Sequence, residues 1–305
     1  MKLLKARTIA KQIQEQISDK VSMLGANGFT PQLRILWIGD DSSSKWFVNS
    51  KIKLANKLGI AVSVERFSNN VLERDVENVI YEFNRDPRIN GILISLPLPS
   101  TFDKVSQKRL LNRINPYKDV DCVTWENRGR LYTNRPAVVL PATVRSCMML
   151  AESVEDISEK NVVFIGTGNV GAPLYGALMN KYPTFNSICI CNKYTKNLIE
   201  KTRKADLIFS AVGKPHLITG DMISPNTIII DAGITKVGLE NVNGKVKDKY
   251  AGDVDIWSLN DIECTVTPTP GGVGTLTTTM IMNNLMNTQS TLDKIAYLSG
   301  RRGGL

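Results

Sequence analysis

The chain has 305 residues, of which 42% are hydrophobic, so it can bury two modest cores and two domains are expected. A formal net charge of +9 favours anionic ligands such as nucleotide phosphates, whereas the basic residues are too scattered to predict an RNA-binding surface. No apolar run approaches the roughly 20 residues that cross a bilayer, which excludes a membrane partner.

The start of the chain carries no secretory signal: it lacks an apolar h-region and a cleavage site. It is basic and free of acidic residues until Glu15, so a mitochondrial matrix location stands as the alternative to a cytoplasmic one. The spacing of the cysteines predicts neither a disulfide framework nor a metal site, and it favours a reducing compartment. The cysteines are Cys122, Cys147, Cys189, Cys191 and Cys264.

In the first half of the chain, an amphipathic helix is expected within the first 30 residues, because Ile9, Ile13 and Ile17 recur at helical spacing. Short β-rich runs then alternate with helical patterns. This alternation predicts an α/β domain built on a parallel sheet. The strands are expected at 34–38, 61–64 and 91–96, and the helices at 44–58 and 73–84.

The second half reads as another strand–helix series. A helix over 143–153 leads into it, and the near-continuous apolar strands are typical of a doubly wound sheet that is buried on both faces. A long Met-rich helix over 276–298 closes the chain. The strands are expected at 161–165, 187–191, 206–212, 227–232 and 264–267.

The first strand of this second series runs directly into Gly166-Thr-Gly-Asn-Val-Gly171, a complete G-x-G-x-x-G, with a helix-like segment from Ala172. In a dinucleotide site the first glycine allows the tight turn, the second admits the pyrophosphate and the third lets helix and strand pack closely. The helix N-terminus then offers unpaired N–H groups to the phosphates. A tight turn with nothing bound is the alternative.

Three further segments stand out, although each is ambiguous alone. Gly91–Pro99 (GILISLPLP) places Ser95 near the carboxyl end of a strand, where open α/β sheets bind ligands. Lys118–Asp121 (KDVD) sets two carboxylates beside a lysine, and Thr267–Gly274 (TPTPGGVG) is a stiff and then flexible loop.

Taken together, these motifs resemble the bifunctional methylenetetrahydrofolate dehydrogenase/cyclohydrolase family over the whole chain. Besides GILISLPLP, KDVD and PGGVG, the resemblance is carried by SKWFVNSKIK, AVGKP and GDV. It implies an α/β fold with an N-terminal parallel-sheet α/β domain, a C-terminal Rossmann dinucleotide-binding domain and a folate cleft between them. The first domain would span 1–145 and be completed by the helix 276–298, and the Rossmann domain would span 146–275.

The resemblance also implies roles for individual residues. Lys51 matches a lysine that assists the chemistry, and Asp121 matches a carboxylate that holds the pterin ring by accepting from two N–H donors. Such a lysine must be partly neutral near pH 7. Ser95 completes the catalytic set. Substrate binding falls to Phe47, Pro97, Pro270, Gly271 and Gly272, and cofactor binding to Thr143, Gly166, Gly168, Asn169, Val170, Gly171, Asn192, Lys193, Val212, Gly213 and Ile234.

The chain departs from the family pattern within this site. Phe47 stands at a tyrosine position, Ser95 at a glutamine position and Cys122 at a glycine position. The glycine turn is about one residue shorter than in the family and lacks its arginine. No acidic residue lies near Asn192 to bind a ribose 2′-hydroxyl, whereas Lys193 could meet a 2′-phosphate, which favours NADP over NAD.

The expected function is therefore hydride transfer from 5,10-methylenetetrahydrofolate to NADP (or NAD), with cyclohydrolase activity weak or lost. That second activity depends most on a tuned lysine, while hydride transfer needs mainly the orientation of two bound ligands. The alternative is an inactive family member that serves as a structural subunit of a larger assembly, mitochondrial or RNA-containing. Kinship suggests a homodimer formed through the Rossmann domain.

Overall fold

The computed structural model describes residues 1–39, 42–133, 139–242 and 245–298, and the chain divides into two compact units. One unit contains Lys11–Ala142 and the chain from Thr278 on, and the other contains Met1–Ala10 and Thr143–Thr277. They are named here after their sheets, the three-stranded unit and the six-stranded unit.

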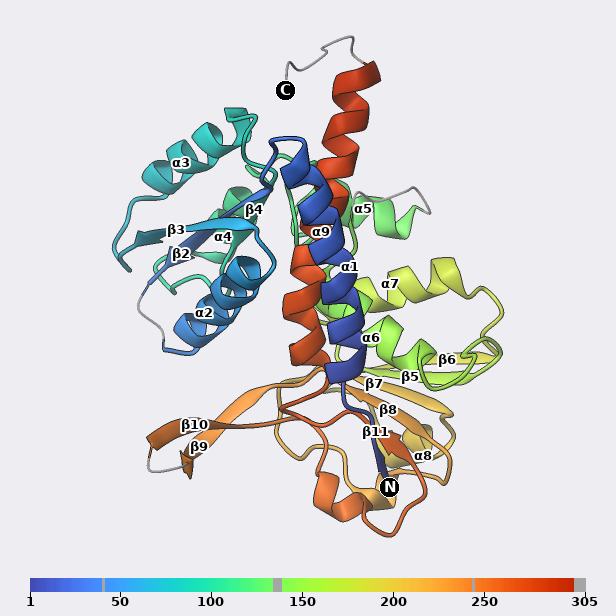
Figure 1. The fold of residues 1–305 in the computed structure, drawn as a ribbon. Coiled ribbons are helices and arrows are strands. Elements are labelled where there is room, and N and C mark those ends of the chain that lie inside the picture. The colour runs from blue at the N-terminus through green and yellow to red at the C-terminus, as the bar shows by residue number, and fades with distance from the viewer. Residues whose placement is uncertain (40–41, 134–138, 243–244, 299–305) are drawn as a thin grey trace. The chain divides into compact units, whose positions relative to one another are not determined.

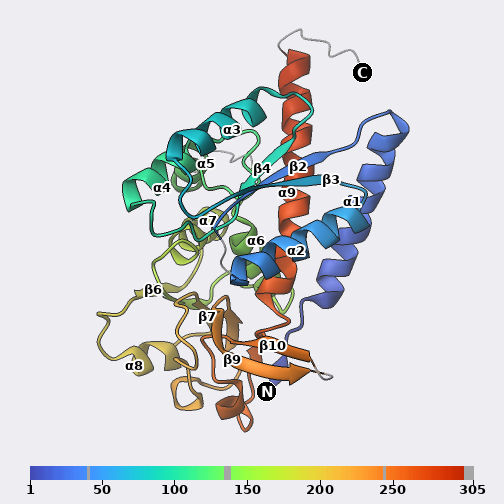
Figure 2. The same cartoon turned by 90° about the vertical axis from the view of Figure 1, so that its left-hand side faces the viewer.

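The three-stranded unit is built on a parallel sheet of order β3-β2-β4. The strands are β2 (Gln32–Ile38), β3 (Ala61–Phe67) and β4 (Gly91–Ile94), which are the three predicted from the sequence. Figures 1 and 2 show α2 and α3 on opposite sides of this sheet. The helices that begin in the first half of the chain are α1 (Arg7–Ala26), α2 (Ser42–Lys57), α3 (Glu73–Arg85), α4 (Lys104–Leu111) and α5 (Trp125–Tyr132).

Successive side chains of each strand point to opposite faces of the sheet, and apolar side chains occur on both faces. Leu36, Ile38 and Ile92 pack with Ile80 of α3 and Leu110 of α4 in one buried cluster. Helix α4 has an ordinary N-cap: the Asp103 carboxylate accepts the Ser106 N–H at 2.7 Å.

The opposite face of this sheet receives the last helix, α9 (Val273–Leu298). A side chain at Gly91 would collide with Leu285 of α9, so β4 and this helix pack closely. Asn284 donates from Nδ2 to the carbonyl oxygens of Val120 at 2.9 Å and Leu140 at 2.8 Å. The helix expected at 276–298 thus belongs to the three-stranded unit from Thr278 on.

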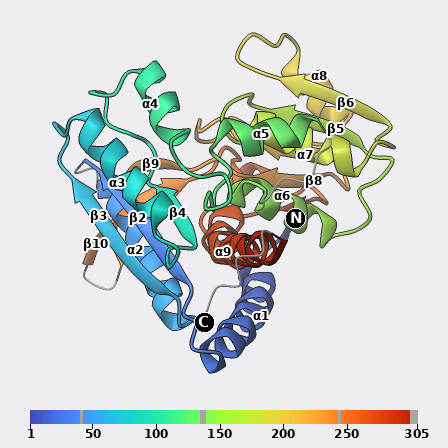
Figure 3. The ribbon, with the colours of Figure 1, turned by 90° about the horizontal axis from the view of Figure 1, so that it is seen from above.

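The six-stranded unit carries the doubly wound sheet, with strand order β1-β11-β8-β7-β5-β6 and parallel pairing throughout. Figure 1 shows α6 and α7 on one face and α8 on the other, and Figure 3 shows β6 at the outer edge. The strands are β1 (Lys2–Leu3), β5 (Asn161–Ile165), β6 (Ser187–Cys191), β7 (Leu207–Ser210), β8 (Ile228–Asp231) and β11 (Thr265–Val266), and the helices are α6 (Ala142–Glu152), α7 (Gly171–Lys181) and α8 (Leu198–Arg203).

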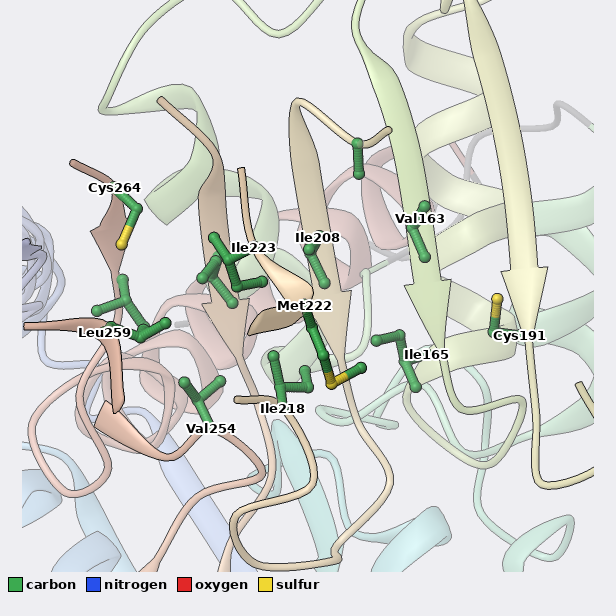
Figure 4. Packing of buried hydrophobic residues seen from close by; sticks show 13 residues of the cluster. Val163, Ile165, Cys191, Ile208, Ile218, Met222, Ile223, Val254, Leu259 and Cys264 are labelled. Carbon is green, nitrogen blue, oxygen red and sulfur yellow. The ribbon is translucent and has the colours of Figure 1, made fainter. Parts of the chain in front are cut away.

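Each face of this sheet has its own core. Val163, Ile165 and Ile208 meet loop residues such as Met222 and Leu259 in the cluster drawn in Figure 4. On the other face Phe164 stacks on Phe209 with ring centroids 5.3 Å apart and meets Tyr175 of α7 edge-on at 5.8 Å. The continuous apolar strands therefore have the double burial that their sequence indicates.

Helices α4, α5 and α8 lie where no helix was expected, and two regions of β-structure also differ from the sequence expectation. The first residues form β1, which pairs with β11, so the first helix begins only at Arg7 and residues 1–10 belong to the six-stranded unit. The second is an antiparallel ribbon of β9 (Thr235–Val242) and β10 (Lys245–Ala251), where no strand was expected. Short 3₁₀ turns lie at Gly220–Met222 and Ile256–Leu259. None of the helices in the described ranges has the length and apolarity to cross a membrane.

Candidate active site

Lys51 lies on α2 in the three-stranded unit, one helical turn after Phe47. Its Nζ donates to the Phe47 carbonyl oxygen at 3.3 Å and lies 5.6 Å from the centre of the Phe47 ring. The residue is half-buried. Burial lowers the pKa of Lys51, because the ammonium loses solvation, and the charge of Asp121 opposes this shift. The helix thus holds an amine with a reduced proton affinity beside an aromatic ring.

Asp121 provides the carboxylate that faces this amine. Burial raises the pKa of Asp121 to about 6; the Ala142 N–H, donating at 3.1 Å, and the charges of Lys51 and Arg128 act in the opposite direction. Asp121 and Lys51 influence each other electrostatically, so two of the predicted catalytic residues are brought together within one unit.

The two carboxylates of the KDVD motif do different work. Asp119 is fully buried and accepts the N–H groups of Val123 at 3.1 Å and Thr124 at 2.9 Å, the Thr124 hydroxyl at 2.8 Å and the Asn127 amide at 3.2 Å. These bonds shape the loop and use the acceptor capacity of Asp119. In the described part of the chain, Asp121 accepts only the Ala142 N–H, which leaves lone pairs for a ligand.

Ser95 follows β4 directly, and its N–H donates to the Leu36 carbonyl oxygen at 2.8 Å. The residue is 8% exposed, and no hydrogen bond joins its hydroxyl to Lys51 among the described residues. Pro97 lies two residues further on and is exposed. The third predicted catalytic residue therefore lies at the carboxyl end of β4, without a hydrogen bond to the amine in the described part of the chain.

The glycine turn lies in the six-stranded unit between β5 and α7, as predicted. Gly166 has φ +104°, and a side chain at Gly171 would collide with the Gly166 carbonyl group, so both positions require glycine. A side chain at Gly168 would meet nothing within 4 Å, which leaves this point open to a ligand. Val170, the N-cap residue of α7, provides no side-chain cap. The Ala172 N–H donates to the Gly168 carbonyl oxygen at 3.2 Å and Pro173 has no N–H, which leaves the Gly171 N–H for phosphate oxygens, fewer groups than the sequence indicates.

Most of the remaining predicted cofactor residues lie just after the carboxyl ends of strands in this unit, where open sheets bind nucleotides, whereas Thr143 lies in α6. Asn192 begins a turn after β6 in which its side chain accepts the Tyr194 N–H at 2.9 Å. Lys193 is exposed, with Nζ 4.9 Å from the Tyr194 ring centre. After β7 come Val212, which is 43% exposed, and Gly213, which has φ +74°. Ile234 follows β8 and is 40% exposed. Asn169 is exposed, and Thr143 is half-buried in the first turn of α6.

The loop Pro270–Gly272, predicted to bind substrate, follows β11 in the six-stranded unit. Pro270 is exposed, and Gly271 has φ +113°. The Gly271 carbonyl oxygen accepts the Ala6 N–H at 3.0 Å, and the Gly272 N–H donates to the Pro268 carbonyl oxygen at 2.7 Å. Backbone geometry therefore accounts for the glycines of this loop.

Three features of the site were not predicted from the sequence. Cys122, where the family has glycine, adopts φ +53°, a left-handed conformation that explains why glycine suits the position. Arg128 donates from Nε to the Cys122 carbonyl oxygen at 3.0 Å and acts on Asp121 through its charge. Asp253, in the GDV motif, accepts three hydrogen bonds in the six-stranded unit; the motif was recognised, but no role had been inferred for it.

The geometry first defines a class of protein: a dinucleotide-type turn lies on a doubly wound sheet, and a half-buried lysine and carboxylate lie in a second unit. Comparisons then identify the family. Residues 4–121 match the tetrahydrofolate dehydrogenase/cyclohydrolase catalytic domain, and residues 141–292 match the NAD(P)-binding domain of the same family. The chain belongs to the tetrahydrofolate dehydrogenase/cyclohydrolase family.

Individual relatives agree with this assignment. The chain is 36% identical over 287 residues to a protein named bifunctional protein FolD from Fusobacterium nucleatum, covering 93% of this chain and 96% of the relative. A Campylobacter jejuni FolD structure superposes with a TM-score of 0.83 at 31% identity, covering 95% of this chain and 99% of that one. For a Trypanosoma brucei FolD, described in complex with NADP and an inhibitor, the TM-score is 0.87 at 28% identity, with 96% and 98% covered.

No group of three or more potential metal ligands occurs in the part of the chain that the structure describes.

Proposed function

We propose that the protein oxidises 5,10-methylenetetrahydrofolate to 5,10-methenyltetrahydrofolate by hydride transfer to NADP or NAD, with weak or absent cyclohydrolase activity. The observation that carries the proposal is the half-buried Lys51, with a lowered pKa, beside an Asp121 that keeps free acceptor capacity. FolD relatives are named as bifunctional proteins, and the T. brucei structure is described with NADP.

In this proposal, the side chains of the three-stranded unit hold the folate. The Asp121 carboxylate accepts two pterin N–H donors, a bidentate arrangement that fixes the orientation of the ring. Phe47 offers a ring face for stacking, and Lys51 moves protons at the reacting end of the ligand. Nicotinamide, when bound, accepts the hydride, while the open Gly168 position and the N-terminus of α7 hold the pyrophosphate.

The weakness of the cyclohydrolase step follows from what surrounds Lys51. Hydrolysis needs an amine held in one protonation state and one orientation. Phe47 contributes a carbonyl oxygen and a ring but no hydroxyl, and no hydrogen bond from Ser95 reaches the amine among the described residues. Because burial lowers the pKa of Lys51, its amine can still transfer protons, but without those two hydrogen bonds it is poorly oriented for hydrolysis. The catalytically inactive alternative gains no support from any of these observations.

The test is a spectrophotometric assay of the purified full chain with 5,10-methylenetetrahydrofolate, run in parallel with NADP and NAD. Reduction of the nicotinamide with accumulation of the methenyl product is the expected result. Reduction without accumulation would show an intact cyclohydrolase and overturn the second half of the proposal. No reduction and no thermal shift with either cofactor would overturn all of it.

NADP preference rests on Lys193, whose exposed ammonium lies in the turn after β6. Lys193→Ala should raise the KM for NADP about tenfold and leave that for NAD unchanged, because only NADP carries a 2′-phosphate. Lys196→Ala, three residues further on and also exposed, is the matched control. An equal loss for both cofactors would remove Lys193 from cofactor selection.

The same protein is proposed to be a cytoplasmic homodimer. The β9–β10 ribbon exposes Val237, Leu239 and Val246 at 42%, 64% and 69%, and strand register places Leu239 and Val246 on one face. Contiguous exposed apolar side chains commonly mark a protein interface. Sedimentation of the purified chain should give the mass of a dimer, and a monomer at micromolar concentration would refute this part.

A further inference from the structure

Two buried carboxylates lie close together near the carboxyl ends of the strands in the six-stranded sheet, which also carries the glycine turn. Asp231, the last residue of β8, is 1% exposed, and Asp253, two residues after β10, is fully buried. Buried carboxylates are costly unless several donors compensate them, so each of these must be held by hydrogen bonds. Their donors show what the pair does.

Asp253 binds the loop that follows β7. Its Oδ2 accepts the Ser210 hydroxyl and the Val212 N–H, both at 2.7 Å, and its Oδ1 accepts the Lys214 N–H at 2.9 Å. Between the two N–H donors lies Gly213, with φ +74°. One carboxylate thus spans this turn and fixes its backbone from both sides.

Asp231 in turn holds Asp253. Its Oδ1 accepts the N–H groups of Gly233 at 2.8 Å and Asp253 at 3.2 Å, and its Oδ2 accepts that of Val254 at 3.0 Å. The packing is reciprocal, because a side chain at Gly233 would collide with the Asp253 carboxylate and one at Gly252 with the Asp231 carboxylate. The position of Asp253 is therefore fixed by the strand next to the one whose loop it binds.

The loop held by Asp253 contacts the glycine turn. The Ala211 N–H donates to the Ile165 carbonyl oxygen at 2.9 Å, and a side chain at Gly166 would collide with the Ala211 carbonyl group. Val212, next in the loop, is 43% exposed at the carboxyl edge of the sheet. A shift of this loop would change both the surface offered by Val212 and the space beside Gly166.

We propose that Asp253 is a positioning residue for the dinucleotide: it holds the 211–214 loop against the glycine turn and so sets the nucleotide affinity without contacting the reacting atoms. This rests on the proposed function, since it assumes that the glycine turn binds NADP or NAD. Asp231 acts one step further back, through Asp253.

The discriminating pair of variants is Asp253→Asn and Ser210→Ala. An asparagine presents one N–H₂ group, so whichever way it is oriented, a backbone N–H of the loop loses its acceptor. Ser210→Ala removes a donor to the same carboxylate and leaves both loop N–H bonds in place. Each variant therefore loses a hydrogen bond at this carboxylate. Only Asp253→Asn loses one that holds the backbone of the loop, so a difference between the variants reports on loop positioning.

Three measurements are made on the full chain: NADP affinity by titration calorimetry, thermal midpoint, and hydrogen exchange of the Val212 and Lys214 amides. Asp253→Asn should weaken NADP binding about tenfold and accelerate exchange of at least one of the two amides. Ser210→Ala should keep NADP affinity within about twofold and leave both amides protected. Affinity for tetrahydrofolate should be the same in both variants and the wild type.

Unchanged NADP affinity in Asp253→Asn, or losses in both variants that only track the thermal midpoint, would overturn the positioning role. A wild type that binds neither NADP nor NAD would instead sink the proposed function and, with it, the link from the loop to nucleotide affinity. The amide exchange separates these cases, because it reports the hold of Asp253 on the loop whether or not a nucleotide binds.

Discussion

Phe47 and Ser95 mark the point at which this chain differs most from the bifunctional pattern. Restoring tyrosine and glutamine in the double variant Phe47→Tyr/Ser95→Gln should increase the cyclohydrolase rate at least about tenfold, because both groups can hydrogen-bond the Lys51 amine and general acid–base catalysis contributes about 10²-fold or more. The dehydrogenase rate should change little. The measurement is the decay of methenyltetrahydrofolate absorbance above the solvent rate, and adding Lys51→Met should abolish the gain. A double variant no faster than wild type would contradict this account of Lys51.

Cys122 provides a stability prediction with an unusual sign. At most positions alanine is more stable than glycine, but Cys122 is fully buried with φ +53°, where a Cβ costs about 1–2 kcal/mol. Cys122→Gly should therefore be about 1 kcal/mol more stable than Cys122→Ala. Urea unfolding of the two variants checks the order. Alanine ranking above glycine would show that the backbone relaxes out of the left-handed region.

The sequence alone does not show which of the two carboxylates in KDVD binds a ligand and which holds the loop. The resemblance indicated Asp121 as the ligand-binding carboxylate. The structure is consistent with this, because the Asp119 carboxylate already accepts the loop N–H groups of Val123 and Thr124. Which carboxylate accepts these N–H groups depends on how the backbone of the following residues is oriented, and the spacing of residues along the chain does not determine that orientation.

At the scale of elements, the closing helix depends on a polar residue. Asn284 of α9 is 1% exposed and binds two carbonyl oxygens, those of Val120 and Leu140. Asn284→Ala should lower the free energy of unfolding by about 2–4 kcal/mol, because two buried acceptors lose their donor. Asn283→Ala, at a half-buried neighbouring position, should cost less than about 1 kcal/mol. Equal losses in urea unfolding would mean that packing, and not this amide, holds the helix.

Most regular elements were predictable because each has a local signature. Strands β4, β5 and β8 are built on continuous apolar runs, and α3 begins with acidic residues and ends with Arg85. β1 has two residues and exists only through its pairing with β11, so no local signal announces it. The β9–β10 ribbon does have one, the Asn243-Gly244 pair between alternating residues, which was overlooked; these two residues lie outside the described ranges.

At the scale of the whole molecule, each unit contains a carboxylate with a raised pKa. Burial and the charge of Asp253 raise the pKa of Asp231 to about 7, and burial raises that of Asp121 to about 6. Asp86 behaves in the opposite way, because hydrogen bonding to Arg88 lowers its pKa to about 2. The lowered pKa of Asp86 affects stability only in acid, whereas the raised pKa values of Asp121 and Asp231 affect it up to about pH 7. The chain has a single histidine, which limits other titrations in this range.

The sign of the effect follows from proton linkage. Between the unfolded value near 3.8 and the folded values of about 6 and 7, the native protein binds more protons than the unfolded chain, so stability falls as pH rises. At about 1.4 kcal/mol per pKa unit, wild type should lose about 4 kcal/mol between pH 5 and pH 8, about 3 of it through Asp231. Asp231→Asn cannot ionise, so whatever its absolute stability, its urea midpoint should vary much less over this range. A variant that keeps the wild-type slope, or a wild type that gains stability towards pH 8, would show that Asp231 stays ionised in the folded protein. Its carboxylate would then be fully compensated by the N–H groups of Gly233, Asp253 and Val254.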